Sequence, residues 1–253
     1  IDDRECSIRR YVEAAKSPGE IETFGLAGFF GIPMRYRPVD GRDEMILAPE
    51  GQNPSTILVE AITDKEVAKK WVRTRKLLAW MSLGWEKASF SPFGSLVLST
   101  LWPVSLARLM AISFSPGLKY DFKQWFQSKI LPEYRTDFQL PIPADQAALM
   151  LARSFRDIGT HERFAKIVLV LGHGSVTVNN PFYAAYNCGA CGGRDGGPNA
   201  RLLSRLANNK DVRQALEKNH QIKIPDDTIF VGANHNTTAD QIEFYDVDKL
   251  PES

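Results

Sequence analysis

The chain has 253 residues, of which 43% are hydrophobic and 24% are charged, and its formal net charge is +1. This composition is typical of a globular protein that is long enough to bury a sizeable core. The small net charge produces no general field for binding nucleic acid, so we expect no nucleic-acid partner. Three cysteines are too few for a disulfide scaffold and fit a reducing compartment.

The amino-terminal segment combines a cluster of charges with a predicted helix. The sequence begins at Ile1 with IDDRE, and we expect it to be a fragment of a longer protein. Asp2 and Arg4 stand two residues apart, so their side chains can pair in an extended segment. The apolar residues of the following IRRYVEAAK recur at helical spacing. Residues 25–38 should then contain a short strand, which Pro33 places at a sheet edge.

The middle of the chain is predicted to be helical. Residues 64–83 have apolar positions at helical spacing among many lysines and arginines, which indicates a solvated face, or else a surface for anionic lipid headgroups or for an acidic partner. Residues 88–107 contain no charged side chain and match a membrane span in length. Because Pro, Gly, Ser and Thr dilute their apolarity, we expect a buried or partner-covered helical hairpin instead. Residues 120–126 indicate another helix.

The second half alternates helices with short apolar runs, which predicts an α/β fold with helices flanking a mostly parallel sheet. The aliphatic run 167–171 is typical of a central strand with both faces covered. His173 would lie just beyond its carboxyl end, where open α/β sheets bind ligands, and His235 follows a second strand near the same edge. The expected helices span residues 144–158, 198–206 and 211–218, and the second strand spans 228–231.

His173 and Cys188 are candidate ligands of a soft metal ion. One strand and its following loop deliver both, and zinc is the metal that such donors suggest. Cys188 and Cys191 form a C-x-x-C, which also allows a redox role, although the pair lies in a glycine-rich loop and not at a helix start after the strand. Either residue type can instead be a buried structural side chain. The glycines lack the pattern of a phosphate-binding loop.

Four segments together resemble the DabA family, the large subunit of a bacterial inorganic-carbon pump. They are IDDRECSIRRYVEAA, ETFGLAGFFG, VLGHGSVTVNNPFYAAYNCGACGGRDGGPNAR and ANHNTT. The family is similar to β-carbonic anhydrases, so the resemblance implies a Zn²⁺ site with Asp2, His173 and Cys188 as ligands and Arg4 as the partner of Asp2. A further cysteine ligand would immediately precede Ile1 and is absent from this chain.

The resemblance also implies a function and an organisation. Residues 1–253 would form one β-carbonic-anhydrase-like domain with a helical insertion at about 64–135. Asp2 would leave the metal to pair with Arg4, and zinc would lower the pKa of a bound water to roughly 7, giving a hydroxide that converts CO2 to bicarbonate. The implied partner is a membrane-embedded antiporter-like subunit of the DabB type, with this chain peripheral on the cytoplasmic face of the bacterial inner membrane.

One alternative to this function stays open. The cysteines could belong to a redox domain, or to a structural zinc domain that acts as a scaffold without CO2 chemistry.

Overall fold

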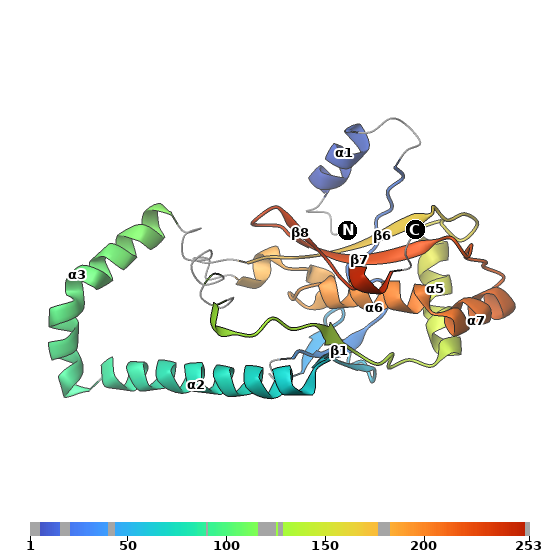
Figure 1. Cartoon of the computed structure of the whole chain (residues 1–253). Helices are drawn as coiled ribbons and strands as arrows, with labels where there is room; N and C mark the ends of the chain where they lie inside the picture. Colours follow the sequence, from blue (N-terminus) through green and yellow to red (C-terminus); the bar gives the residue numbers. More distant parts are fainter. Residues whose placement is uncertain are drawn as a thin grey trace. The chain divides into compact units, whose positions relative to one another are not determined.

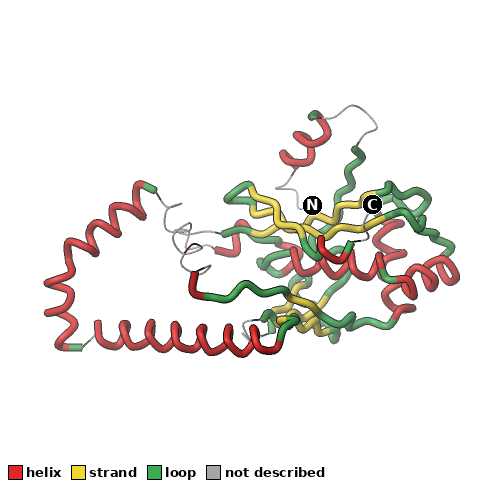
Figure 2. Tube along the Cα trace, in the orientation of Figure 1, coloured by secondary structure: helices red, strands yellow, loops and turns green. Residues whose placement is uncertain are grey.

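The computed structural model describes residues 6–15, 21–39, 44–89, 91–115, 125, 129–176 and 183–250. These residues have a mixed α/β fold (Figures 1 and 2) and divide into two compact units. Unit 1 comprises Ile1–Val59, Phe138–Thr177 and Pro181–Ser253, and unit 2 comprises Glu60–Asp137 and Val178–Asn180. Unit 2 includes the range 64–135, and its interpretation as an insertion into one carbonic-anhydrase-like domain stays a prediction.

The helices are α1 (Cys6–Ala14), α2 (Lys65–Ser89), α3 (Pro92–Phe114), α5 (Ala144–Asp157), α6 (Gly197–Asn208) and α7 (Lys210–His220). The strands are β1 (Met34–Arg37), β2 (Met45–Leu47), β3 (Ile57–Val59), β4 (Ala61–Ile62), β5 (Thr136–Asp137), β6 (Ile167–Gly174), β7 (Ile229–Asn236) and β8 (Gln241–Phe244). Short 3-10 helices are η2 (Tyr183–Tyr186), η3 (Gly189–Cys191) and η4 (Val247–Lys249).

The sheet that carries the candidate site has the order β6-β7-β8 (Figure 1). β6 and β7 are parallel and paired along their whole lengths, and β8 is antiparallel to β7. β6 is therefore an edge strand among the described residues, and the expectation of a central strand is wrong. The pairing also continues past the aliphatic run, so His173 lies inside β6 and pairs with His235.

The other described sheets are small. In unit 1, β1 lies between β2, which is antiparallel to it, and β3, which is parallel to it. Pro33 therefore precedes a middle strand, and the predicted edge position is wrong, because a proline just before a strand removes none of its ladder hydrogen bonds. In unit 2, β4 and β5 are antiparallel. The prediction of a mostly parallel sheet is not confirmed by this mixture.

The two faces of β6 differ in burial, contrary to the prediction that both are covered. Val170 and Gly172 are buried on the face that packs on α6, whereas Ile167 is 69% exposed and Leu169 is 45% exposed on the other face. Alternation of this kind is the ordinary period of a half-buried strand. The sequence did not indicate this alternation, because all five residues from 167 to 171 are aliphatic.

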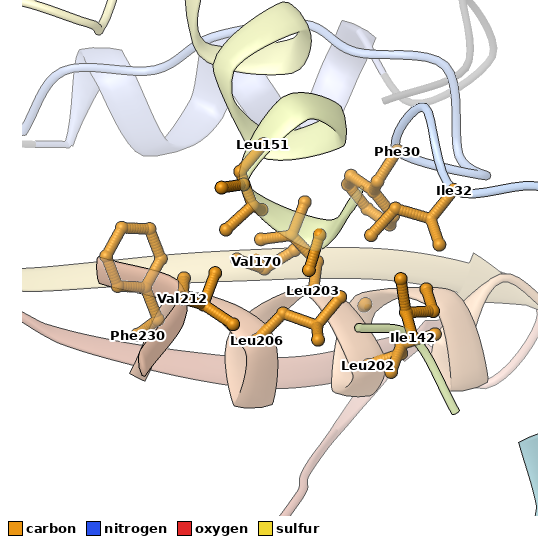
Figure 3. Packing of buried hydrophobic residues seen from close by; sticks show 14 of the residues in the cluster. Phe30, Ile32, Ile142, Leu151, Val170, Leu202, Leu203, Leu206, Val212 and Phe230 are labelled. Carbon is orange, nitrogen blue, oxygen red and sulfur yellow. The ribbon is translucent and has the colours of Figure 1, made fainter. Parts of the chain in front are cut away.

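The core of unit 1 joins α5, α6 and α7 to one face of β6 and β7 (Figure 3). Phe230 of β7 is 1% exposed, and its ring lies 5.9 Å from that of Phe155 and 6.1 Å from that of Phe164. Leu206 of α6 and Leu151 of α5 are fully buried beside them. Each such side chain contributes roughly 1.5–3 kcal/mol by leaving water, so this cluster holds the sheet that carries the site.

The predicted helices of the second half are confirmed; α6 and α7 extend beyond their predicted ends, and α5 ends one residue earlier than predicted. Residues 144–158 correspond to α5, 198–206 to α6 and 211–218 to α7, and the strand at 228–231 continues as β7 to Asn236. The side chain of Asn209 accepts hydrogen bonds from the backbone amides of Asp211 and Val212, which fixes the start of α7.

Unit 2 contains the two longest helices (Figure 1). The predicted helix 64–83 is α2, which Asp64 caps by accepting hydrogen bonds from the amides of Glu66 and Val67. Residues 88–107 were expected to form a buried or partner-covered hairpin, but they contribute to α2 and to the single helix α3, whose described apolar side chains are mostly exposed. Of the helix expected at 120–126, all but Trp125 lies outside the described residues.

The long helices also bear on membrane spanning. Within the part of the chain that the structure describes, no helix is both long enough and apolar enough to cross a membrane.

Candidate functional site

The structure places two of the four predicted site residues. His173 near the end of β6 is 3% exposed, and Cys188 in the following loop is fully buried. Their side chains meet, because the ring of His173 interacts with the thiol of Cys188. Asp2 and Arg4 lie outside the described residues, so their positions relative to this pair stay predictions.

The loop around Cys188 is closed by its own backbone. The amide of Cys188 donates to the carbonyl of Arg194 at 3.0 Å, and the two residues form an isolated β-bridge. The Cys188 carbonyl accepts from the amides of Cys191 at 3.2 Å and Gly193 at 3.0 Å. Gly192 and Gly193 have φ angles of 67° and 72°, a backbone conformation that glycine adopts without strain. These contacts hold Cys188 and Cys191 on the same side of a tight turn.

Hydrogen bonds attach this loop to the end of β6. The side-chain oxygen of Asn187 accepts from the amide of Ser175 at 2.8 Å, and the amide of Gly196 donates to the carbonyl of His173 at 2.9 Å. Because Asn187 immediately precedes Cys188 and Ser175 lies two residues after His173, the pair is fixed from both sides. The role of Asn187 could not be inferred from the sequence, since its partner is known only from the fold.

The surroundings of Cys188 favour its thiolate. A hydrogen bond from the thiol of Cys191 lowers the pKa of Cys188 most. The hydrogen bond and the charge of His173 lower it further. Burial opposes them, but together they lower the pKa of Cys188 from its ordinary value to about 5. The cysteine is therefore ionised at neutral pH, which is the form that binds metals and acts as a nucleophile.

Gly28 covers the sulfur of Cys188. A Cβ atom at this position would lie 2.5 Å from the Cys188 sulfur and 3.7 Å from the Cys191 sulfur. Only a residue without a side chain allows the backbone to pass there. The segment ETFGLAGFFG contributed to the family resemblance, but nothing in its pattern indicated that Gly28 would contact the cysteines.

His235 adds a second imidazole next to the first. It pairs with His173 in the parallel register of β6 and β7, so the two side chains project from the same face of the sheet. His235 is 3% exposed, and its Nε2 lies 3.1 Å from Oδ1 of Asp240. Its expected place at the same sheet edge is therefore confirmed.

Asp195 joins the loop to α6 and β7, and sequence reasoning missed it. Its carboxylate accepts hydrogen bonds from the amide of Gly197 at 2.7 Å and from the side chain of Asn234 at 2.9 Å. Burial raises the pKa of the Asp195 carboxyl, and the hydrogen bonds from Gly197 and Asn234 act in the opposite direction. A carboxylate two residues before a helix start was the available sequence signal.

A thiolate and an imidazole suit zinc, but they are only part of a zinc site. Structural zinc ions take four protein ligands, and catalytic ones take three and keep an open position. Among the described residues, no group of three or more His, Cys, Asp and Glu side chains is arranged to hold a metal ion. His173 and Cys188 fit the requirement as two ligands; the family resemblance implies Asp2 as a third and a cysteine that would precede Ile1 as a fourth.

The chain is similar to proteins named as subunits of a transporter. A family model described as "Probable inorganic carbon transporter subunit DabA" matches residues 1–253. Proteins of that name from Sorangium cellulosum and Dechloromonas aromatica are 37% and 34% identical to the chain; each alignment covers 100% of the chain and 26% of the relative. The protein from Haloarcula marismortui is 32% identical, with 100% of the chain and 33% of the relative covered.

The matches cover the whole chain but only part of each relative. The chain spans about a quarter to a third of the length of these relatives. No solved structure matches it. Because the family model covers every residue and the relatives are at least 32% identical, the chain belongs to the DabA family.

Proposed function

We propose that the chain is the zinc-binding part of a subunit that takes up inorganic carbon, converting CO2 to bicarbonate. The observation that carries this proposal is the buried thiolate of Cys188 beside His173, at the carboxyl end of a parallel strand. Membership of a family named for inorganic carbon transport supports the substrate. The finer likeness of the fold to a β-carbonic anhydrase, with a mostly parallel sheet, is part of the same proposal.

In this proposal His173 and Cys188 hold Zn²⁺ together with Asp2. The low pKa of Cys188 means that no proton has to be removed at neutral pH before the sulfur binds. When bound, zinc would acidify a water molecule and so supply a nucleophile for CO2 near neutral pH. Asp2 would exchange between the metal and Arg4. The pairing of Asp2 with Arg4 would therefore act as a gate that opens a position on the metal for water.

The protein contributes position and shielding. The amide of Gly196 and the side chain of Asn187 fix the two ends of the segment that separates His173 from Cys188. Cys191 donates a hydrogen bond to the Cys188 sulfur, which keeps that sulfur in its ionised form. Both cysteines are fully buried, so the pair lies away from bulk water and its electrostatic interactions are strengthened.

The proposal includes a partner and a location. Relatives are named as transporter subunits, and a subunit requires a second component. We assign this component to a membrane-embedded, antiporter-like subunit of the DabB type. The chain would then be peripheral on the cytoplasmic face of the bacterial inner membrane.

Metal analysis of the purified protein tests the proposal. We expect one zinc per chain, lost in Cys188→Ala and in His173→Ala, and retained in Cys6→Ala as a matched cysteine control. Restoration of zinc by Cys188→His, but not by Cys188→Ser, would separate ligand loss from misfolding. Zinc-free wild type, or zinc that persists in both alanine variants, would refute the metal site.

The hydrogen bond between Cys191 and Cys188 favours one alternative, a redox pair without CO2 chemistry. Thiol titration distinguishes the two. A Cys188–Cys191 disulfide that forms and is reduced reversibly in metal-free protein, without any zinc binding by the reduced form, would support the redox role.

A further inference from the structure

Exposed apolar side chains gather in unit 2, on α3 and on the second half of α2. Trp80 of α2 is 72% exposed, and in α3 Trp102 is 60% exposed and Phe114 is 80% exposed. Figure 1 shows α3 leaving the end of α2 at a corner, so the two helices do not cover each other's sides. Figure 2 shows the same arrangement along the Cα trace. Large apolar surface of this kind marks a site of interaction.

The apolar surface of α3 surrounds the helix. Leu96, Leu101, Trp102 and Leu106 are all at least 39% exposed, and at 3.6 residues per turn they point in different directions around the axis. Arg108 is the single charged residue in the α3 sequence. A helix that is apolar on all sides is suited to an environment that encloses it, whereas a groove on a protein partner covers one stripe.

Two hydroxyl groups of α3 form hydrogen bonds within the helix and do not require water. The hydroxyl of Ser99 donates to the carbonyl of Leu96 at 2.7 Å, and that of Thr100 donates to the same carbonyl at 3.3 Å. Hydroxyls bonded back to the preceding turn remain satisfied in an apolar medium. Pro103, which lacks an amide hydrogen, lies in the middle of the helix. The hydroxyl groups of Ser99 and Thr100 therefore permit transfer of this part of α3 out of water.

The first half of α2 carries positive charge directly before this apolar surface. Six of the seven lysines and arginines of α2 fall between Lys65 and Lys76, with Glu66 as the one acidic residue there. Lys70, Arg73 and Lys76 are exposed. Basic residues that flank an apolar segment are attracted to anionic lipid headgroups, and tryptophans such as Trp80 and Trp102 favour the boundary between headgroups and acyl chains.

We propose that α2 and α3 dock the chain on the surface of an anionic lipid bilayer. α3 lies among the lipids of one leaflet, and the basic half of α2 lies against the headgroups. Charge complementarity and the exposure of α3 on all sides select lipid over a protein groove. This inference deepens the membrane location in the proposed function and rests on that location, but not on the zinc chemistry.

Flotation of the full chain with lipid vesicles tests the docking. One set contains phosphatidylcholine alone, and the other contains equal amounts of phosphatidylcholine and phosphatidylglycerol. We expect strong binding only to the second set, weakened by added salt. Each lysine or arginine near an anionic surface contributes roughly a fivefold factor to binding, so Lys70→Glu with Arg73→Glu should reduce binding at least about 25-fold. Brominated lipids should quench the fluorescence of Trp102.

Matched variants separate docking from general effects. Lys210→Glu with Lys218→Glu reverses two exposed charges on α7 and should leave binding unchanged, as should Val247→Glu, which alters an apolar residue that is 55% exposed in η4. Trp102→Glu with Leu109→Glu should abolish binding while circular dichroism stays unchanged, because both side chains are exposed.

Four outcomes would overturn the inference. Equal binding of wild type to the two vesicle types would remove the role of charge, and undiminished binding of the α2 or α3 variants would remove these helices. Failure to bind either vesicle type would indicate that a protein partner, and not lipid, covers the apolar surface of α2 and α3. Self-association in the absence of lipid that Trp102→Glu abolishes would indicate a second copy of the chain. Zinc content measured on the same samples reports separately on the proposed function.

Discussion

The core of unit 1 differs from α3 and the second half of α2, in unit 2, in how its large apolar side chains are buried. In unit 1, Phe230 and Leu206 are at most 1% exposed and pack in a continuous core, whereas in unit 2 Trp80 and Phe114 are at least 72% exposed. Burial stabilises a fold, but an exposed apolar side chain contributes to stability only when something covers it. The core of unit 1 therefore holds the candidate site in place, whereas α2 and α3 present the apolar surface that we propose to bind lipid.

The largest expected effect comes from exchanging one aromatic residue in each unit. Phe230→Ala should lower the free energy of unfolding by about 3–5 kcal/mol, because it opens a cavity next to Phe155. Phe114→Ala should change it by less than about 0.5 kcal/mol, because that side chain is 80% exposed. Urea denaturation measures both. Equal losses would show that the aromatic residue of α3 is buried within the chain.

A pair of glycines sharpens the comparison at the cysteine site. Gly28→Ala should cost about 1–3 kcal/mol of stability, because the new methyl group would overlap the sulfur of Cys188. Gly84→Ala, in α2, has nothing within 4 Å of the new atom and should stabilise the helix by about 0.5–1 kcal/mol. Thermal unfolding of the two variants provides the test. A neutral Gly28→Ala would mean that the loop can move away from Cys188.

The pH dependence of stability should report the Cys188 thiolate in metal-free protein. Its folded pKa of about 5 lies below the ordinary 9.0. The stabilisation it contributes is therefore complete above pH 9 and disappears progressively as the pH falls to about 5. The stability difference between wild type and Cys188→Ser should follow this window. Cys191→Ser should raise the midpoint of thiolate absorbance, since Cys191 is the main cause of the low pKa. A difference that stays constant with pH would contradict the assignment.

The smallest expected effect concerns the exposed ion pair of α2. Glu66 and Lys69 are 2.7 Å apart, and both side chains are more than 70% exposed. Glu66→Gln should change stability by less than about 1 kcal/mol, yet it should strengthen binding to anionic vesicles because α2 gains net positive charge. Urea denaturation and flotation of the same sample provide the two readings. Weakened vesicle binding would count against the docking surface.

The sequence was informative where local pattern decides structure. The helical spacing of residues 144–158 and the aliphatic run 167–171 correctly indicated α5 and β6. The predicted end of β6 was too early. His173 and Gly174 belong to the strand because they pair with His235 and Asn236 of β7. A residue far along the chain sets that boundary, and no local pattern records it.

The candidate site shows the same division. His173 and Cys188 were singled out by their residue types, and the structure brings them together. Asn187 and Gly28 were missed, because their importance comes from contacts with Ser175 and with the Cys188 sulfur that only the fold creates. The ligand role of Asp2 came from family resemblance, and its position falls outside the described residues.

X-ray absorption at the zinc edge tests the central claim most directly, because it identifies the atoms around the metal. For purified protein we expect sulfur at about 2.3 Å and nitrogen or oxygen at about 2.0–2.2 Å, with the sulfur contribution reduced in Cys188→Asp and the nitrogen contribution reduced in His173→Asp. A spectrum with oxygen and nitrogen neighbours alone, unchanged by either substitution, would show that the thiolate and imidazole of this loop do not hold the zinc.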